Sequence, residues 1–403
     1  MPKLIEINTT LNSGSTGRIA EQIAAKAQEH GWDCFYAHGG RYVGKSEFPS
    51  IQVSSKCDNY VHAFVGEYLG RHGLGSTIST KRFVKKIKEI NPDVIHLHNI
   101  HGYYLNYKVL FEFLTESKIP VVWTLHDCWS FTGHCTHFDN ADCNKWKTEC
   151  GGCPLQMAQY KSRLIDRSRN NYLLKKHLYS NLKNVTIVPV SHWLESLVGQ
   201  SILNHFQVRV IQNGIDLNVF KPTDNKIRER FNIPDDKMIV LGVLGSGFDE
   251  KGKEEFVELS KQSNLQIVLV GLTNDDKVGL PDSIIQLGRT SSQGELAEFY
   301  SAAEVMLNPT YNDTFPTTNT ESLACGTPVV TYKTGGSPEI LDENTGIVVE
   351  KGDVDGLRQA IDTIKRHGKF SYSESCRKRA EMYFNKDDRY EDYVRLYEAV
   401  INR

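Results

Sequence analysis

Hydrophobic positions along this chain follow two patterns: short apolar runs rich in β-branched residues, and longer segments with apolar residues at helical spacing. The apolar runs predict strands at Leu4–Asn8, Val94–His98, Val121–Leu125, Asn184–Val190 and Val208–Gln212, and then at Met238–Val243, Gln266–Val270, Ile284–Leu287, Val305–Asn308 and Val329–Tyr332. The helical segments include Gly17–His30, Thr80–Asn91, Lys253–Gln262, Glu295–Ala302 and Thr318–Cys325. Strands that alternate with helices favour parallel sheets covered on both faces. Two such series predict an α/β protein with two Rossmann-like domains.

The junction between the two series is marked by the turn-forming cluster Asn213–Asp216 and by Pro222. We assign residues 1–205 to the first domain and 206–386 to the second. The last segment, residues 387–403, has helical spacing of Tyr390, Tyr393 and Tyr397. This segment either finishes the second domain or crosses back onto the first.

Composition excludes some classes of protein. The 403 residues carry 47 Lys and Arg against 49 Asp and Glu, so the chain lacks the basic excess of a general nucleic-acid binder. No apolar run approaches the roughly 20 residues that a membrane-spanning helix needs. The first residues, Met1–Asn8, read as a charged strand and not as a secretion signal, so we expect a cytoplasmic protein.

Candidate ligand-binding groups follow predicted strands, where ligands of open parallel sheets bind. Residues 12–18, between a strand and a helix, form an incomplete G-x-G-x-x-G in which Gly14 lets the backbone approach an anion; a plain tight turn explains them equally well. His126 and Asp127 directly follow another strand, although a lone histidine is often structural. The upstream histidines His96, His98 and His101 suggest a metal site, but His96 and His98 share one strand face and a buried, hydrogen-bonded role is the stronger interpretation.

The most informative stretch covers residues 308–321. A strand ends at Asn308, and Pro316 suits the first position of the helix that follows. The Thr317 and Thr318 amides then point out of a helix N-terminus, which favours a phosphate.

Two carboxylates belong to the same stretch. Asp313 precedes the predicted helix, and Glu321 lies about one turn inside it, where it can hydrogen-bond a hydroxyl group. A glycine-rich turn, Gly335–Glu339, follows the next strand.

These motifs together resemble the retaining glycosyltransferases of family 4. The resemblance rests on Asp313-x7-Glu321 with Ser322–Val330, on Ile211–Asp216 with Phe220–Pro222, on Lys251-Gly252, and on Gly335–Glu339. The motifs cover most of residues 205–350, and the N-terminal half matches more loosely.

The resemblance implies a GT-B fold, with two Rossmann-like domains facing each other across a cleft. The C-terminal domain would bind a nucleotide-sugar and the N-terminal domain the acceptor. The resemblance implies that Glu321 holds the ribose and that Asp313 binds hydroxyls of the donor sugar. Lys251 would neutralise the pyrophosphate, assisted by the Thr317 and Thr318 amides. His126 would lie near the anomeric centre, and Gly14 would lie against the donor phosphate. His126, Asp313 and Lys251 are the expected catalytic residues. The leaving phosphate would take the acceptor's proton, so no divalent ion is required.

Two positions depart from the family pattern. The family usually has Glu where this chain has Asp313, which keeps the charge but shortens its reach. The family usually has an arginine shortly before its lysine, whereas this chain has Gly245, Ser246 and Gly247 in that loop. With Ser246 in the phosphate loop, Lys253 or Arg289 could supply the missing charge.

Four of the nine cysteines lie close together in the sequence: Cys135, Cys143, Cys150 and Cys153. Cys150-x2-Cys153 has the spacing with which two thiolates bind one tetrahedral ion. The cluster belongs to an insertion at about residues 128–154. We expect a structural zinc site there, with packed free thiols, disulfides or a redox role as alternatives.

Two basic segments suggest contact with anionic lipid. Lys81–Ile90 is an amphipathic helix whose apolar side would pack on the first sheet or lean on a membrane, and residues 160–177 form a second basic stretch. The leading hypothesis is a retaining glycosyltransferase that uses a UDP- or GDP-sugar and a glycan or lipid-linked acceptor in cell-envelope or capsular polysaccharide synthesis, at the inner face of the membrane. The alternatives are a nucleotide-sugar epimerase of the same fold and a zinc-clipped nucleotide-sugar-binding protein without catalysis.

Overall fold

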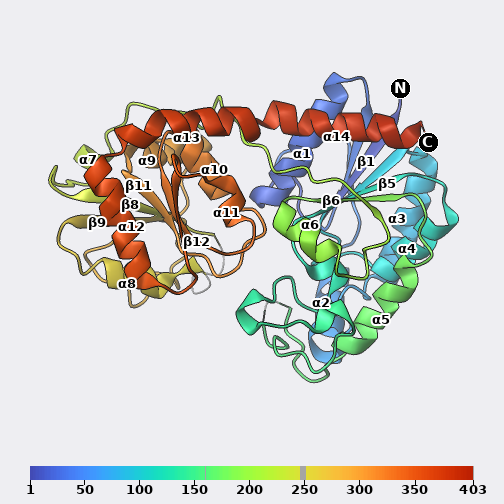
Figure 1. Ribbon diagram of the computed structural model, residues 1–403. Helices are drawn as coiled ribbons and strands as arrows, with labels where there is room; N and C mark the ends of the chain where they lie inside the picture. Colours follow the sequence, from blue (N-terminus) through green and yellow to red (C-terminus); the bar gives the residue numbers. More distant parts are fainter. Residues whose placement is uncertain (159, 246–250, 403) are drawn as a thin grey trace. The chain divides into compact units, whose positions relative to one another are not determined.

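The computed structural model describes residues 1–158, 160–245 and 251–402, and the chain forms two compact units (Figure 1). The first unit comprises Met1–Gln212 together with Asp387–Arg403, and the second comprises Asn213–Lys386. Each unit is built around one parallel sheet, as the two series of strands predict.

Within the described residues, seven parallel strands form the sheet of the first unit, in the order β3-β2-β1-β4-β5-β6-β7. They are β1 Lys3–Asn8, β2 Asp33–His38, β3 Ser50–Gln52, β4 Val94–Leu97, β5 Val121–Leu125, β6 Val185–Pro189 and β7 Gln207–Val208. The connecting helices are α1 Gly14–Glu29, α2 Lys56–Leu69, α3 Thr77–Ile90, α4 Tyr107–Glu116, α5 Ser168–Tyr179 and α6 His192–Val198. The central strands β1, β4, β5 and β6 are buried along their whole length apart from Lys3, as expected of parallel strands covered on both faces.

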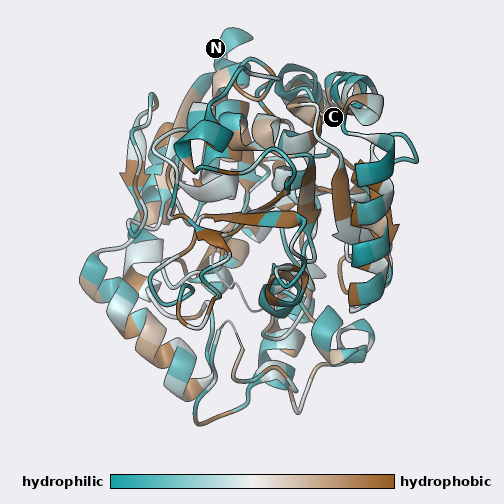
Figure 2. Ribbon diagram, turned by 90° about the vertical axis from the view of Figure 1, so that its left-hand side faces the viewer, coloured by the Kyte–Doolittle hydropathy of each residue, from teal (hydrophilic) through white to brown (hydrophobic). Residues whose placement is uncertain are grey.

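The sheet of the second unit has the order β10-β9-β8-β11-β12-β13, again counted over the described residues. Its strands are β8 Met238–Val243, β9 Leu265–Val270, β10 Ile285–Gln286, β11 Val305–Asn308, β12 Val329–Tyr332 and β13 Gly346–Val349. Its helices are α7 Ile227–Arg230, α8 Lys253–Leu259, α9 Gln293–Ala302, α10 Thr317–Ala324, α11 Ser337–Ile340, α12 Val354–His367 and α13 Phe370–Tyr383. Figure 2 shows hydrophobic strands with helices around them that carry hydrophilic residues.

The domain boundary differs from the sequence prediction of 205/206. Thr186 of β6 pairs with Gln207 of β7, so residues 206–212 belong to the first unit. The last helix, α14 Lys386–Ile401, is assigned to the first unit from Asp387 onward. Its Tyr390, Tyr393 and Tyr397 are buried there, because their helical spacing presents one apolar face to the core of that unit.

Strand order determines where ligands can bind. In the first unit the chain builds outward from β1 to β3 and then returns to place β4 on the other side of β1. In the second unit the chain likewise builds outward from β8 to β10 and then returns to place β11 on the other side of β8. Ligands of open α/β sheets bind beyond the carboxyl ends of strands at such switch points. The loops that follow β1, β4, β8 and β11 are therefore the places to look for a site.

Candidate active site

The loop after β11 brings Asp313 to Lys251. The Lys251 ammonium lies 2.7 Å from Asp313 Oδ2 and 3.3 Å from the carbonyl oxygen of Asn312. Asp313 Oδ1 accepts a hydrogen bond from the backbone N–H of Phe315 at 3.2 Å. Both side chains are partly exposed, 24% for Lys251 and 22% for Asp313, so a ligand can reach a cation and an anion at one switch point.

Two glycines allow the backbone to pack closely around this pair. Gly335 has φ +54°, and a Cβ atom there would lie 1.6 Å from the carbonyl oxygen of Asp313. Gly252 has φ +85°, and a Cβ atom there would lie 2.3 Å from Pro309 Cγ. Only glycine tolerates both the left-handed backbone and the close approach. The glycine-rich turns of the sequence thus shape the loops that hold Lys251 and Asp313.

Helix α10 begins directly behind this pair. Pro316 is the N-cap residue of α10, whereas the sequence analysis placed it at the first helical position, which Thr317 occupies. No side chain makes a capping hydrogen bond at this helix start. Thr317 and Thr318 occupy the first turn and are partly exposed. The first-turn amides of a helix point outward and favour an anion.

Glu321 lies one turn inside α10, as predicted, and is buried. Its Oε2 accepts a hydrogen bond of 2.9 Å from the hydroxyl group of Tyr300 on α9. Burial, together with the Glu321 charge, raises the pKa of Tyr300 well above its ordinary value, so Tyr300 remains a donor. The carboxylate is therefore fixed from behind. The sequence motif contained no sign of Tyr300.

Lys253 and Arg289 are the residues proposed to replace the charge of the missing arginine. Ser246 falls outside the described residues. Arg289 is exposed in the loop after β10, the edge strand that β9 separates from β8. Lys253 Nζ donates a hydrogen bond of 3.3 Å to the carbonyl oxygen of Val278. The structure thus brings together Lys251, Asp313, Thr317, Thr318 and Glu321 but does not group Arg289 with them.

In the first unit, Gly14 is the first residue of α1 and follows the switch-point strand β1. It has φ +69°, is exposed, and a Cβ atom there would meet nothing within 4 Å. The N-cap residue Ser13 makes no side-chain capping bond. The start of α1 is thus uncapped, and the anion-binding role of Gly14 stays a prediction beside the plain tight turn.

His126 follows β5 and stacks on His98, which follows β4. His126 Nε2 lies 3.0 Å from His98 Nδ1, and the rings are 5.3 Å apart and inclined by 17°. Burial, reinforced by His98, lowers the pKa of His126 well below its ordinary value. His126 is thus neutral at physiological pH, and its orientation depends on His98.

His98 in turn rests on a buried carboxylate in β1. His98 Nε2 lies 2.8 Å from Glu6 Oε2, and His96 Nδ1 lies 3.0 Å from the same oxygen. Burial favours the neutral acid, but hydrogen bonds and charge from His96 and His98 hold the pKa of Glu6 down at about 2. Burial and His96 lower the pKa of His98 to about 4. The chain Glu6–His98–His126 is a buried carboxylate–imidazole–imidazole relay.

The Glu6 end of this chain of hydrogen bonds contacts α14. The Tyr397 hydroxyl lies 2.6 Å from His96 Nδ1 and donates to Glu6 Oε1 at 3.3 Å. His96 Nε2 lies 2.8 Å from Thr124 Oγ1, which donates to the Tyr393 hydroxyl at 3.0 Å. The C-terminal helix therefore supports the carboxylate that orients His126.

Glu6, His96 and His98 are also the set that could hold a metal ion among the described residues, with ligand atoms within 4.8 Å of one another. Their polar atoms are engaged in the hydrogen bonds above, so the structure favours the buried, hydrogen-bonded role that the sequence suggests for this strand face. His101 lies elsewhere: its Nε2 contacts Asp127 Oδ2 at 2.7 Å and its Nδ1 contacts the Tyr160 hydroxyl at 2.7 Å.

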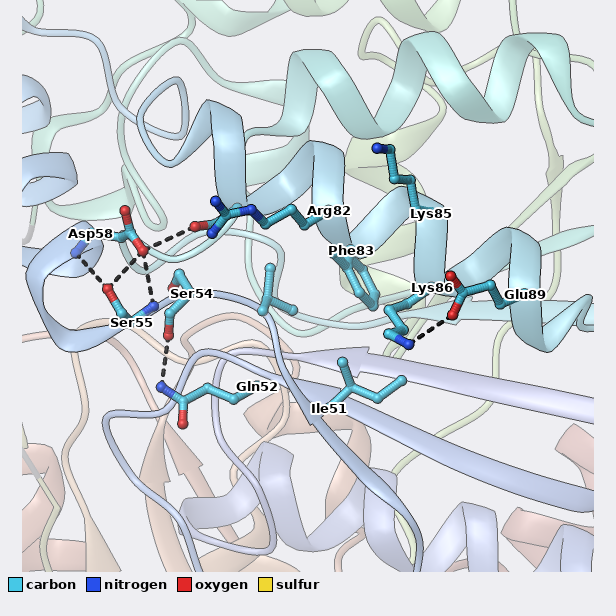
Figure 3. A pocket seen from close by; sticks show the side chains of 12 residues that line it. Ile51, Gln52, Ser54, Ser55, Asp58, Arg82, Phe83, Lys85, Lys86 and Glu89 are labelled. Atoms are coloured by element: carbon cyan, nitrogen blue, oxygen red, sulfur yellow. Dashed lines mark hydrogen bonds and ion pairs between the residues drawn. The ribbon is translucent and has the colours of Figure 1, made fainter.

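The basic helix α3 packs its apolar side on the first unit, since Phe83 and Ile87 are buried. This outcome agrees with packing on the sheet and not with burial of that side in lipid. In the second basic stretch, Lys175 is also buried. A pocket of about 630 Å³ lies beside α3, and its lining residues include Ile51, Arg82, Phe83, Lys85 and Lys86 (Figure 3). This pocket is separate from the switch points.

The fold defines the class of protein. The structure is similar to sucrose-phosphate synthase (tll1590) from Thermosynechococcus elongatus, with a TM-score of 0.73, 18% identity and 100% of both chains covered. It is also similar to Anabaena Alr3699/HepE in complex with UDP, with a TM-score of 0.67, 14% identity, and coverage of 99% of this chain and 100% of that chain. The protein therefore has the two-domain GT-B glycosyltransferase fold, which confirms the predicted fold class.

Sequence comparison identifies the family. Residues 17–219 match the family described as "Glycosyltransferase Family 4", and residues 223–382 match "Glycosyl transferases group 1". The chain belongs to glycosyltransferase family 4. It is 22% identical over 369 residues to WcaC of Escherichia coli (strain K12), described as a colanic acid biosynthesis glycosyl transferase, covering 87% of this chain and 88% of WcaC.

Proposed function

We propose that this glycosyltransferase moves a sugar, with retention of configuration, from a UDP- or GDP-sugar to a glycan or lipid-linked acceptor in cell-envelope or capsular polysaccharide synthesis. The observation that carries the proposal is the Lys251–Asp313 pair at the β8/β11 switch point, with α10 and Glu321 directly behind it. Similarity to a colanic acid glycosyl transferase supports the polysaccharide role, and the UDP complex of the similar Alr3699/HepE supports a nucleotide-sugar donor.

Each group has a task that follows from its chemistry. The Glu321 carboxylate accepts hydrogen bonds from ribose hydroxyls, held in place by Tyr300. The Lys251 ammonium and the first-turn amides at Thr317 and Thr318 stabilise the diphosphate as negative charge develops on it. Asp313 accepts hydrogen bonds from hydroxyls of the donor sugar. Stabilising the leaving group in this way lets an oxocarbenium-like state form without a strong protein nucleophile.

In the transfer step one bond breaks and one bond forms at the anomeric carbon. The bond between the anomeric carbon and the donor phosphate oxygen breaks, and a bond from the acceptor oxygen to the same carbon forms. The acceptor's proton passes to the leaving phosphate oxygen on the same face, which retains configuration. This step requires no divalent ion. His126 would lie near the anomeric carbon, and Gly14 would lie against the donor phosphate.

Donor identity is tested by thermal shift with UDP-, GDP-, ADP- and dTDP-sugars, since a ligand that binds the native state raises its stability by mass action. We expect one uridine or guanosine member to raise Tm. Transfer is then measured with an added acceptor, and the configuration of the product is read by NMR. Conversion of the donor sugar without an acceptor would instead support the epimerase, and an inverted product would contradict retention.

Lys251→Ala tests the phosphate assignment. We expect kcat/KM to fall roughly a hundredfold or more, because one preorganised charge on the leaving group is lost. Lys333→Ala is the matched control, since Lys333 forms an exposed ion pair with Glu350 on the surface of the same unit. Full activity of Lys251→Ala would contradict the assignment.

Asp313→Ala separates catalysis from mere binding. If the protein is a transferase, Asp313→Ala should lose both sugar transfer and slow hydrolysis of the donor. A nucleotide-sugar-binding protein that zinc stabilises, without catalysis, would bind the donor but would not hydrolyse it. Its donor affinity would not change in Asp313→Ala.

We also propose that the protein acts in the cytoplasm, with peripheral contact at the inner face of the membrane. In the described part of the chain, no helix is both long and apolar enough to cross a bilayer.

A further inference from the structure

Within the described residues, the four clustered cysteines are not grouped as metal ligands. Cys135, Cys143, Cys150 and Cys153 are free thiols of intermediate exposure. The group whose ligand atoms lie within 4.8 Å of one another is the Glu6 set described above. The structural zinc site therefore stays a prediction from the spacing of the cysteines.

In the second unit, a buried glutamate on α8 ties two loops together. Glu255 Oε1 accepts a hydrogen bond of 2.5 Å from the Tyr311 hydroxyl and one of 3.1 Å from the Tyr332 hydroxyl. Tyr311 belongs to the loop after β11, and Tyr332 is the last residue of β12. One side chain therefore joins α8, the loop that carries Asp313, and the sheet.

Both tyrosines act as donors in this contact. Burial, together with the hydrogen bond to Glu255, raises the pKa of Tyr311 to about 12. Burial and the charge of Glu255 also raise the pKa of Tyr332. The two rings pack edge to face, with centroids 5.6 Å apart and planes inclined by 72°. Their packing holds the two hydroxyls on the same oxygen.

This contact lies beside the Lys251–Asp313 ion pair and joins the same two segments of the chain. Glu255 is four residues after Lys251, and Tyr311 is two residues before Asp313. The ion pair is partly exposed, and partly exposed pairs hold a geometry weakly. Glu255 is buried, and a hydrogen bond to a carboxylate away from water is a stronger constraint.

The proposed function asks both members of the ion pair to face the donor at once, Lys251 toward the diphosphate and Asp313 toward the sugar hydroxyls. Their direct contact then no longer sets the distance between the two segments. A misplacement of about 1 Å near the reacting atoms can lower a rate by about a hundredfold. A contact outside the donor site is therefore needed to keep the two segments in register.

We propose that Glu255 and Tyr311 are positioning residues that hold Lys251 and Asp313 at the spacing that transfer requires, with Tyr332 anchoring Glu255 to the sheet. They act through Lys251 and Asp313 and do not touch the donor. The inference rests on the proposed function. Neither Glu255 nor Tyr311 belongs to the motifs that carry the family resemblance.

Tyr311→Phe tests the proposal, because it removes one hydroxyl and keeps the ring. We expect kcat to fall roughly tenfold, since Lys251 and Asp313 lose their register. Donor KM and the rise in Tm caused by the donor should stay close to native values, because Glu321 and the first turn of α10 still hold the nucleotide. A native kcat in Tyr311→Phe would overturn the proposal, whether or not KM changes.

Tyr372→Phe is the matched control. Tyr372 belongs to the same unit, and its hydroxyl lies 3.1 Å from His367 Nδ1 on α12. This variant should retain the native kcat. A fall in kcat equal to that of Tyr311→Phe would show that loss of any such hydroxyl lowers activity, and would overturn the specific role of Tyr311.

A double variant separates positioning from a general loss of stability. If Tyr311 acts through Lys251, adding Tyr311→Phe to Lys251→Ala should lower the remaining kcat/KM much less than it lowers that of the native protein. Effects that multiply in the double variant would show an independent structural role and overturn the proposal.

Transfer by the native protein is measured in the same assay. If the native protein transfers sugar and Tyr311→Phe matches it, the positioning role alone is overturned. If the native protein transfers no sugar from any donor of the panel, the proposed function is overturned and this inference with it.

Discussion

The hydrogen bonds around His126 permit one protonation pattern at neutral pH. Glu6 is ionised and can only accept, so His98 Nε2 carries a proton. His98 is neutral, so its Nδ1 accepts, and His126 Nε2 must therefore donate to it. This leaves Nδ1 of neutral His126 as the acceptor nitrogen. Glu6 is a positioning residue: through His98 it sets the tautomer of His126, the residue proposed to lie near the anomeric carbon.

Glu6→Gln should lower kcat roughly tenfold or more, as expected when a histidine is forced into the wrong tautomer. Glutamine presents one oxygen and one NH₂ group where Glu6 presents two acceptors; an NH₂ group that faces His98 Nε2 cannot accept its proton, so His98, and through it His126, reverses its tautomer. Nitrogen-15 NMR of His126 should show the changed tautomer. The matched control is Glu21→Gln, a buried carboxylate of the same unit that accepts from Ser46 and the Glu47 amide. An unchanged kcat with an unchanged His126 signal would contradict the relay.

Among the helices, α2 and α3 form one surface that is apolar along α2 and basic along α3. Asp58 of α2 accepts a hydrogen bond of 2.9 Å from the Ser79 hydroxyl of α3, so the two helices are in contact. Helix α3 turns its apolar side inward and exposes Lys81, Arg82, Lys85 and Lys86. Helix α2 exposes large apolar side chains: Tyr60, Val61, Phe64 and Tyr68. Exposed aromatic residues beside a basic helix suit the interface of an anionic bilayer.

Membrane contact is therefore expected through α2, with α3 supplying charge. The native protein should co-sediment with vesicles that contain anionic lipid, less with neutral vesicles, and less at high salt. Phe64→Asp should weaken binding severalfold, because it places a charge in the apolar face. Phe370→Asp is the matched control, since Phe370 is 93% exposed in the second unit. Equal binding by native protein and Phe64→Asp would exclude this surface.

Over the whole molecule, we expect the two units to differ in their sensitivity to acid. Every histidine of the 14 except His367 lies in the first unit. Burial lowers the pKa of His62 and His98 to about 4, and that of His72 to about 3. In the unfolded chain these groups titrate near 6.5. Between these values the unfolded state binds more protons, so stability falls as pH falls.

Acid should therefore unfold the first unit before the second. The histidine contribution is complete above pH 6.5 and is lost toward pH 4, at about 3 kcal/mol for His98 alone, an order-of-magnitude figure. Glu6 adds a further loss from pH 4.5 toward 2, because its folded pKa is lowered. All five tryptophans belong to the first unit, so their fluorescence reports it alone, while far-UV circular dichroism reports both. Coincident transitions by the two probes would contradict the expectation.

Local sequence pattern was sufficient to predict part of the fold and the group of candidate residues in the second unit. Strands β5, β8, β11 and β12 begin and end where their apolar runs predict, because continuous burial demands continuous apolar residues. The sequence also indicated Lys251, Asp313 and Glu321, since they belong to motifs that resemble those of glycosyltransferase family 4. It did not reveal β2, β3 or β13: the apolar run of β2 covers only Cys34–Ala37, β3 is only three residues long, and β13 begins at a glycine.

What the sequence determined by itself was the α/β class, the two series of strands, and the family motifs at the carboxyl ends of β8 and β11. These features depend on neighbours along the chain. Tertiary structure alone decided that α14 returns to the first unit, that Tyr300 holds Glu321, and that Glu6 reaches His126 through His98. The partners in these contacts lie far apart in the sequence, and only strand order and the packing of helices on a sheet bring them together.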